Sequence, residues 1–175
     1  MGRSQPSVYR CLIIAVGIQF GNFTIANSTK RISSKANIRR DTHMTEAEIS
    51  GISPFFIVNH VPTSLSFYRD RLGFEITFQG PDPDDIFFGI VRRGGAQILL
   101  KDIGVAPVPN YTRDIKKGIA RWDAFVIVPD PDALAAEFAS RDVEFFEPLR
   151  DTHDGLRGFE VKDADGYLLF FGRPR

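Results

Sequence analysis

The sequence contains one cysteine, Cys11, so no intrachain disulfide can form and a zinc site built from paired cysteines is excluded. The apolar run at residues 11–20 is too short to span a bilayer, which needs about 20 apolar residues. Basic residues interleaved with aromatics are lacking after residue 43, so we expect no nucleic-acid partner. The low cysteine content fits a reducing compartment, and we expect a cytoplasmic protein that does not bind membranes.

The net charge of zero hides an uneven distribution. Of the 22 basic and 22 acidic residues, residues 1–43 hold seven bases and one acid, which leaves 15 bases and 21 acids in residues 44–175. The second part therefore carries a net charge of −6, which favours cationic ligands over anionic ones. Phenylalanine is abundant, with 16 copies. So many rings indicate either an aromatic core or a cavity lined with rings, and for any single Phe we favour the core.

Residues 1–43 differ in character from the rest of the chain. Two arginines precede the apolar run and a short polar stretch follows it, as in a secretory signal. The remainder of this segment is rich in Ser, Asn and Arg, which predicts disorder. Either the segment is a targeting sequence, or translation begins at Met44 and the segment is a mis-assigned start. We favour the second interpretation and expect one compact domain over residues 44–175.

Within this domain, β-formers and turn residues predict eight strands. We expect them at residues 52–58, 74–79, 86–92, 96–101, 122–128, 143–146, 158–162 and 167–171. One helix should begin near Pro62 and end at Gly73. A second should begin at Asp130, an N-cap residue followed by proline. Turns are expected at residues 81–85, at Gly94-Gly95 and at residues 163–166.

The order of these elements is βαβββ, a long loop, then βαβββ. The halves match at an offset of about 70 residues, so that Val58 corresponds to Val128. We place the first repeat at about residues 52–102, the loop at 103–120 and the second repeat at about 121–173. The predicted fold class is α+β, with two βαβββ repeats forming a curled mixed sheet and the helices on its outer face.

Three local patterns carry a resemblance to a known family. They are Ser64-Leu65-Ser66-Phe67-Tyr68 followed by Leu72-Gly73-Phe74, the strand Val126-Ile127-Val128, and the turn Asp163-Ala164-Asp165-Gly166-Tyr167. Together with the paired repeats, they resemble the vicinal oxygen chelate superfamily. This superfamily includes glyoxalase I, extradiol dioxygenases, fosfomycin-modifying enzymes and bleomycin-resistance proteins. The resemblance implies the fold but not one chemistry.

The metal-dependent enzymes of this superfamily bind one divalent ion on the concave face through four strand residues. Counting from the motifs, these positions fall on Ser53, Leu99, Asp123 and Phe170. Two of the four have no lone pair to donate, neutral serine is a poor ligand, and one carboxylate cannot hold an ion alone. We therefore expect no metal site, no other cofactor and no catalytic group. His60 and His153 are predicted to lie in loops and do not change this expectation.

Period-two alternation assigns side chains to the concave face. The predicted ligand-binding residues are Phe55, Ile57, Leu99, Tyr111, Trp122, Asp123, Phe125, Arg157 and Phe170. Strict alternation turns Trp122 away from Asp123, although parity is weak at a strand start. Asp123 should bind a ligand cation, pair with a protein base or lie at the wet rim, and Arg157 could pair with Glu160 or with an anionic ligand.

The features resemble the bleomycin-resistance branch, whose members are metal-free and dimeric and sequester cationic drugs. We therefore expect a homodimeric binding protein for a small aromatic or cationic molecule, with antibiotic resistance as one possible role. The alternative is a glyoxalase-like or dioxygenase-like enzyme, a lyase or dioxygenase with an atypical metal site. A dimeric structural or regulatory module without a small ligand is the third possibility.

Overall fold

The structure is a computed structural model that describes residues 49–110 and 122–175. The first half contains β1 (Phe55–Ile57), α1 (Val61–Ser66), a π-helical turn η1 (Phe67–Arg71), β2 (Glu75–Asp82), β3 (Asp85–Arg93) and β4 (Ala96–Lys101). The second half contains β5 (Ala124–Ile127), α3 (Pro131–Ser140), β6 (Phe145–Asp151), β7 (Leu156–Lys162) and β8 (Leu168–Pro174). The predicted fold class, an α+β fold of two βαβββ repeats, is confirmed.

Each repeat forms one four-stranded mixed sheet. The strand orders are β1-β4-β3-β2 and β5-β8-β7-β6, with the first pair of each sheet parallel and the others antiparallel. The two sheets therefore have the same topology, as the repeat in the sequence predicted. None of the helices within the described residues combines the length and apolar composition that a bilayer span requires.

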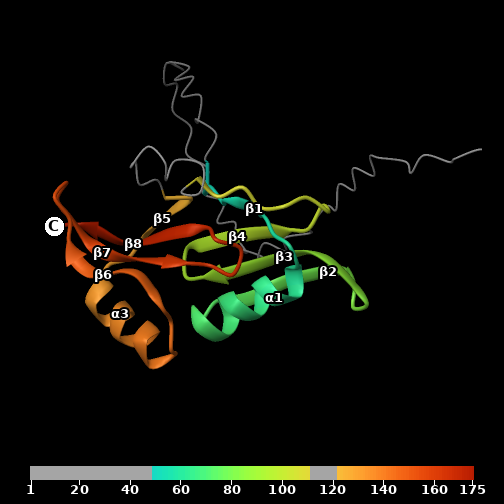
Figure 1. The fold of residues 1–175 in the computed structure, drawn as a ribbon, viewed down its shortest axis with the longest axis horizontal. Helices are drawn as coiled ribbons and strands as arrows, with labels where there is room; N and C mark the ends of the chain where they lie inside the picture. Colours follow the sequence, from blue (N-terminus) through green and yellow to red (C-terminus); the bar gives the residue numbers. More distant parts are fainter. Residues whose placement is uncertain (1–48, 111–121) are drawn as a thin grey trace, which may run out of the picture. The chain divides into compact units, whose positions relative to one another are not determined.

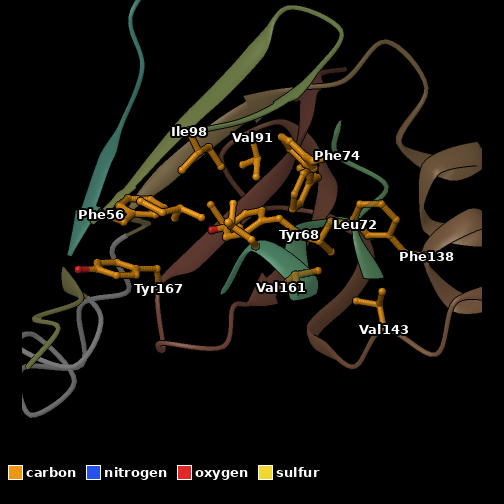
Figure 2. Packing of buried hydrophobic residues seen from close by; sticks show 14 of the residues in the cluster. Phe56, Tyr68, Leu72, Phe74, Val91, Ile98, Phe138, Val143, Val161 and Tyr167 are labelled. Atoms are coloured by element: carbon orange, nitrogen blue, oxygen red, sulfur yellow. The ribbon is translucent and has the colours of Figure 1, made fainter. Parts of the chain in front are cut away.

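Helices cover one face of each sheet, and the side chains on that face form the core. Figure 1 shows α1 and α3 below the strands, while no described helix lies on the opposite face. The core side chains of both halves form one cluster (Figure 2). Leu65 of α1 lies against Gly89, where an added Cβ would meet Leu65 Cδ2 at 2.8 Å. The helix thus approaches the sheet closely because the facing position has no side chain.

The turn between β7 and β8 connects the two halves through a buried carboxylate. Asp163 Oδ1 accepts hydrogen bonds from the backbone N–H groups of Asp165 and Tyr167, while Oδ2 accepts one from the Tyr68 hydroxyl at 2.8 Å. Next to them, the rings of Phe56 and Tyr167 stack at 4.2 Å between centroids (Figure 2). The Asp163 turn therefore joins the second repeat to α1, η1 and β1 of the first.

A second connection uses charged groups at the edge of the core. Arg93 donates to the carbonyl of Leu72 at 2.6 Å and to Glu137 Oε2 at 2.6 Å, and Arg141 pairs with Glu137 Oε1 at 3.1 Å. These side chains are about one-third exposed, at 31% for Arg93 and 35% for Glu137. The hairpin of the first repeat is thereby linked to α3 of the second.

The observed boundaries correct several details of the sequence prediction; for example, the strand expected at residues 143–146 is β6, Phe145–Asp151. The turn expected at residues 81–85 is confined to residues 83–84, since β2 continues through Pro81 to Asp82. β2 is an edge strand with a register shift between Gly80 and Pro81. Proline fits there because an edge strand tolerates a residue without a backbone N–H. The first helix ends as a π-helical turn before Gly73, whose φ of +67° fits the predicted C-cap. Asp130 caps α3 as predicted, accepting from the N–H of Ala133 at 3.0 Å.

Candidate functional site

The face of the second sheet opposite α3 carries an aromatic cluster. Register aligns Phe125 of β5 with Phe170 of β8, and their ring centroids lie 5.1 Å apart. Trp122, just before β5, stacks on Phe170 at 4.2 Å and lies 5.8 Å from Phe125. Phe170 is 1% exposed, whereas Phe125 remains 41% exposed. The buried ring of Phe170 therefore supports the rings of Trp122 and Phe125, which can contact a ligand.

Two glycines explain how Phe170 fits under this cluster. Its ring lies over Gly158 of β7 and Gly172 of β8, where an added Cβ would meet ring atoms of Phe170 at 2.5 Å in each case. The Cβ at Gly158 would also lie 2.4 Å from the carbonyl oxygen of Phe171. Gly158 and Gly172 are register partners, so this glycine pair leaves a slot over the sheet for one phenyl ring, which fixes the surface on which the indole stacks.

Trp122 is oriented by a hydrogen bond to the neighbouring strand. Its Nε1–H donates to Glu160 Oε1 at 3.0 Å, and Glu160 is the register partner of Phe170. Strict alternation turned the indole away from Asp123, toward the helix-covered face, and that expectation is wrong. Trp122 precedes β5, so strand parity does not hold it, and stacking with Phe170 together with the Glu160 bond determines its direction.

A cleft of about 640 Å³ opens beside this cluster. Its lining residues are Asn110, Trp122, Asp123, Ala124, Phe125, Arg150, Thr152, His153, Asp154 and Glu160. It combines an aromatic wall with three carboxylates and one guanidinium. A concave site with an apolar wall and a few polar groups is the usual form of a small-molecule site.

Asp123 lines the cleft, but its oxygens are already engaged. Oδ1 accepts from the N–H of Asn110 at 2.7 Å and Oδ2 accepts from the N–H of Leu168 at 2.8 Å. From the sequence, we expected Asp123 to bind a ligand cation, to pair with a basic side chain of the protein or to lie at the wet rim. Instead, the carboxylate binds two backbone N–H groups and holds Asn110 against the start of β8.

The other predicted site residues are dispersed. Phe55, Ile57 and Leu99 lie in the first sheet, outside the lining of the cleft. Arg157 binds Asp132 of α3 and, at 3.0 Å, Asp151 of β6, and not Glu160. These carboxylates raise the pKa of Arg157 above its ordinary value. The loop residue Tyr111 falls outside the described residues.

The residues present do not fit the family's metal site. Leu99 pairs in register with Phe55, and Phe170 pairs with Phe125, so all four residues in these two rows are apolar. Ser53, two residues before Phe55, receives a hydrogen bond from Gln97 at 3.2 Å. In residues 49–110 and 122–175, no three His, Cys, Asp or Glu side chains are grouped so that they could hold an ion.

A larger groove, of about 970 Å³, lies between the β3–β4 hairpin and the β5–α3 segment. Its lining includes Arg93 and Glu137, which already pair with each other, and exposed Ile127. Because its principal charged groups satisfy one another, it offers less polar recognition than the cleft beside Trp122.

Glu160 is one of several cleft residues that were not selected from the sequence. The strand predicted at residues 158–162 alternates, with Phe159 and Val161 on the core face and Glu160 on the other. That pattern places a carboxylate on the open face, but its proximity to Trp122 depends on the pairing of β7 with β8 and on the path before β5. The sequence therefore indicated which face Glu160 lies on, but not that Trp122 is its hydrogen-bond partner.

Comparison with known proteins agrees with this architecture. A bleomycin-binding protein from Streptomyces verticillus, solved with copper(II)-bleomycin, is 26% identical, with 74% of this chain and 99% of that chain covered and a TM-score of 0.54. TioX from Micromonospora sp. ML1 is 19% identical, with 71% and 100% covered and a TM-score of 0.53. A glyoxalase-related enzyme from Clostridium phytofermentans is 13% identical, with 75% and 99% covered and a TM-score of 0.58. The last two likenesses concern the fold alone.

Two sequence comparisons gave different results. No curated protein matches the chain. The profile of the Glyoxalase/Bleomycin resistance protein/Dioxygenase superfamily matches residues 51–171, which include every strand and helix described above except the last three residues of β8. The resemblance seen in the sequence motifs is thereby confirmed, and the chain belongs to the Glyoxalase/Bleomycin resistance protein/Dioxygenase superfamily.

Proposed function

We propose that the protein is a metal-independent binding protein of bleomycin-resistance type for a small, drug-like molecule with a planar aromatic group. The observation that carries the proposal is the cleft in which Trp122 and half-exposed Phe125 form an aromatic wall over buried Phe170. Offset stacking of rings adds about 0.5–1.5 kcal/mol to the burial of their area. The 26% identity to a protein solved with copper(II)-bleomycin supports a binding role.

Binding is tested by titrating the full chain with bleomycin and with the planar heterocycle acridine. Because Trp122 is the only tryptophan, its fluorescence reports on the cleft, with calorimetry as a second measurement. We expect saturable binding that Phe125→Ala weakens about tenfold, since truncation of a side chain that anchors a ligand costs over about 1 kcal/mol. Val105→Ala, an exposed apolar position outside the cleft lining, is the control and should leave affinity unchanged. Absence of binding to both compounds contradicts the proposal.

The enzyme alternative is separated by metal content. The protein is dialysed against zinc, nickel, manganese and iron(II), and bound metal is measured after washing. The apolar rows Phe55–Leu99 and Phe125–Phe170 lead us to expect no tightly held ion. About one tightly bound metal ion per chain would instead favour the hypothesis that the protein is a lyase or dioxygenase.

We further propose a cytoplasmic homodimer. Support comes from apolar side chains exposed near the ends of β1 and β5, where Ile52 is 93%, Phe55 50% and Ile127 78% exposed. Burial of such side chains between two copies would remove them from water. Light scattering after size-exclusion chromatography measures the mass, and a purely monomeric protein at micromolar concentration would reject the dimer.

A further inference from the structure

The two repeats differ in chemistry at one equivalent position. In the first sheet, register aligns Phe55, Leu99 and Ile90 across β1, β4 and β3. In the second sheet, the corresponding row across β5, β8 and β7 is Phe125, Phe170 and Glu160. A carboxylate thus stands where the other repeat has an aliphatic side chain, although both rows lie on the sheet face opposite the helix. The fold does not require an acid at this position, because Ile90 occupies its counterpart.

Glu160 is 5% exposed, but only one of its oxygens has a partner. Oε1 accepts the indole N–H of Trp122, and no other donor within residues 49–110 and 122–175 reaches Oε2. Among those residues, Arg173 Nε is the one enclosed side-chain N or O atom without a partner, so Oε2 is not enclosed. Glu160 lines the cleft, so a ligand bound there can approach this carboxylate at the oxygen that has no partner.

The other charged groups of the cleft are engaged elsewhere. Asp123 binds two backbone N–H groups, and Asp154 accepts from the Thr152 hydroxyl through Oδ1 and, unlike Glu160, is exposed to solvent. Arg150 pairs with Glu147 at 3.5 Å and is not bonded to Glu160. A nearly buried carboxylate is unfavourable unless a cation or donor compensates it. Within the cleft, Glu160 Oε2 is therefore the acceptor best placed for a ligand.

We propose that Glu160 is the residue that selects for positive charge in the ligand. A protonated ring nitrogen or amine donates to Glu160 Oε2, while the attached planar ring stacks against Trp122 and Phe125. The indole N–H holds the carboxylate through Oε1, so the aromatic and charged contacts are fixed relative to each other. This inference rests on the proposed function, because it specifies the ligand class of the same cleft.

The test compares two probes of nearly the same shape, 9-aminoacridine, which is protonated at neutral pH, and acridine, which is neutral there. Calorimetry measures both dissociation constants for the full chain. We expect 9-aminoacridine to bind about tenfold or more tightly, as charge-assisted hydrogen bonds are roughly twice as strong as neutral ones. Glu160→Gln keeps an acceptor for the indole and should abolish most of this preference without weakening acridine. Glu144→Gln removes one exposed carboxylate outside the cleft lining and should change either affinity less than about twofold.

The outcomes separate the two proposals. If the wild-type protein binds both probes equally, or Glu160→Gln retains the full preference, charge selection by Glu160 is rejected while aromatic binding stands. If the wild-type protein binds neither probe, both proposals fail. Should Glu160→Gln not fold, Glu144→Gln still tests the inference. If Glu144→Gln keeps the preference for 9-aminoacridine, the inference is supported; if it removes the whole preference, general charge explains the preference and the inference is overturned.

Discussion

Replacing Asp163 by asparagine should change how stability depends on pH. Burial raises the pKa of Asp163 from 3.8 to about 6, although hydrogen bonds from Tyr68 and from two backbone N–H groups oppose this rise. A carboxyl with a raised pKa binds more protons in the folded than in the unfolded state between these two values. Its stabilising contribution is therefore complete below about pH 4 and is lost as the pH rises through about 6.

The size of this effect follows from the shift. A displacement of about two units corresponds to about 3 kcal/mol, at about 1.4 kcal/mol per unit. Asp163→Asn keeps a carbonyl oxygen for the N–H groups of Asp165 and Tyr167, and its amide can donate to the Tyr68 hydroxyl. The variant has no proton to lose, so relative to the wild type it should gain about 3 kcal/mol of stability between about pH 4 and pH 7.

Urea unfolding followed by circular dichroism measures both proteins at each pH. The informative quantity is the difference between the two free energies of unfolding at each pH. Carboxylates with lowered pKa values, such as Asp132 and Asp151, contribute equally to both proteins and cancel in this difference. A difference that stays constant across the range would refute the reasoning, since it would mean that ionisation of Asp163 is not coupled to folding.

Two further substitutions test the slot under Trp122 and the charged link between the halves. Gly158→Ala should cost about 1–3 kcal/mol, because its Cβ would lie 2.4 Å from the Phe171 carbonyl oxygen, whereas Gly95→Ala, with nothing within 4 Å, should be nearly neutral in thermal unfolding. Glu137→Gln should lower the free energy of unfolding at neutral pH by up to about 1 kcal/mol, since the arginine pairs are partly exposed. Arg93 lowers the pKa of Glu137, so this loss should shrink as the pH falls through the folded-state pKa; a loss that persists in strong acid would contradict the assignment.

The fold was predictable because the sequence repeats its local signals. In residues 49–110 and 122–175, the eight strands, the two α-helices and the positive-φ glycines at the turns each have a local cause, such as alternation, a capping aspartate or a residue without Cβ. Alternation also placed Phe125 and Ile127 on the exposed face of β5, where they are 41% and 78% exposed. Such features depend on neighbours within a few residues, which a sequence displays directly.

The site was less predictable because its contacts join distant segments. Trp122 and Glu160 are 38 positions apart, and their bond depends on the path of the chain before β5. Arg157 has one of its partners on α3, 25 positions away, and nothing in the sequence near Arg157 pointed to Asp132. The sequence identifies which polar residues lie on the open face, but tertiary pairing decides which of them is available to a ligand.

Asp123 and Glu160 provide the clearest test of that distinction. Both are carboxylates beside Trp122, but Asp123 bridges the N–H groups of Asn110 and Leu168, whereas Glu160 has one oxygen open to the cleft. Asp123→Asn replaces one acceptor by a donor opposite a backbone N–H, so it should destabilise the fold by about 1–3 kcal/mol. It should nevertheless preserve the preference for 9-aminoacridine over acridine, because the variant still presents Glu160 Oε2. If Asp123→Asn removed that preference at unchanged melting temperature, Asp123 would be the charge-selecting group and the assignment to Glu160 would be wrong.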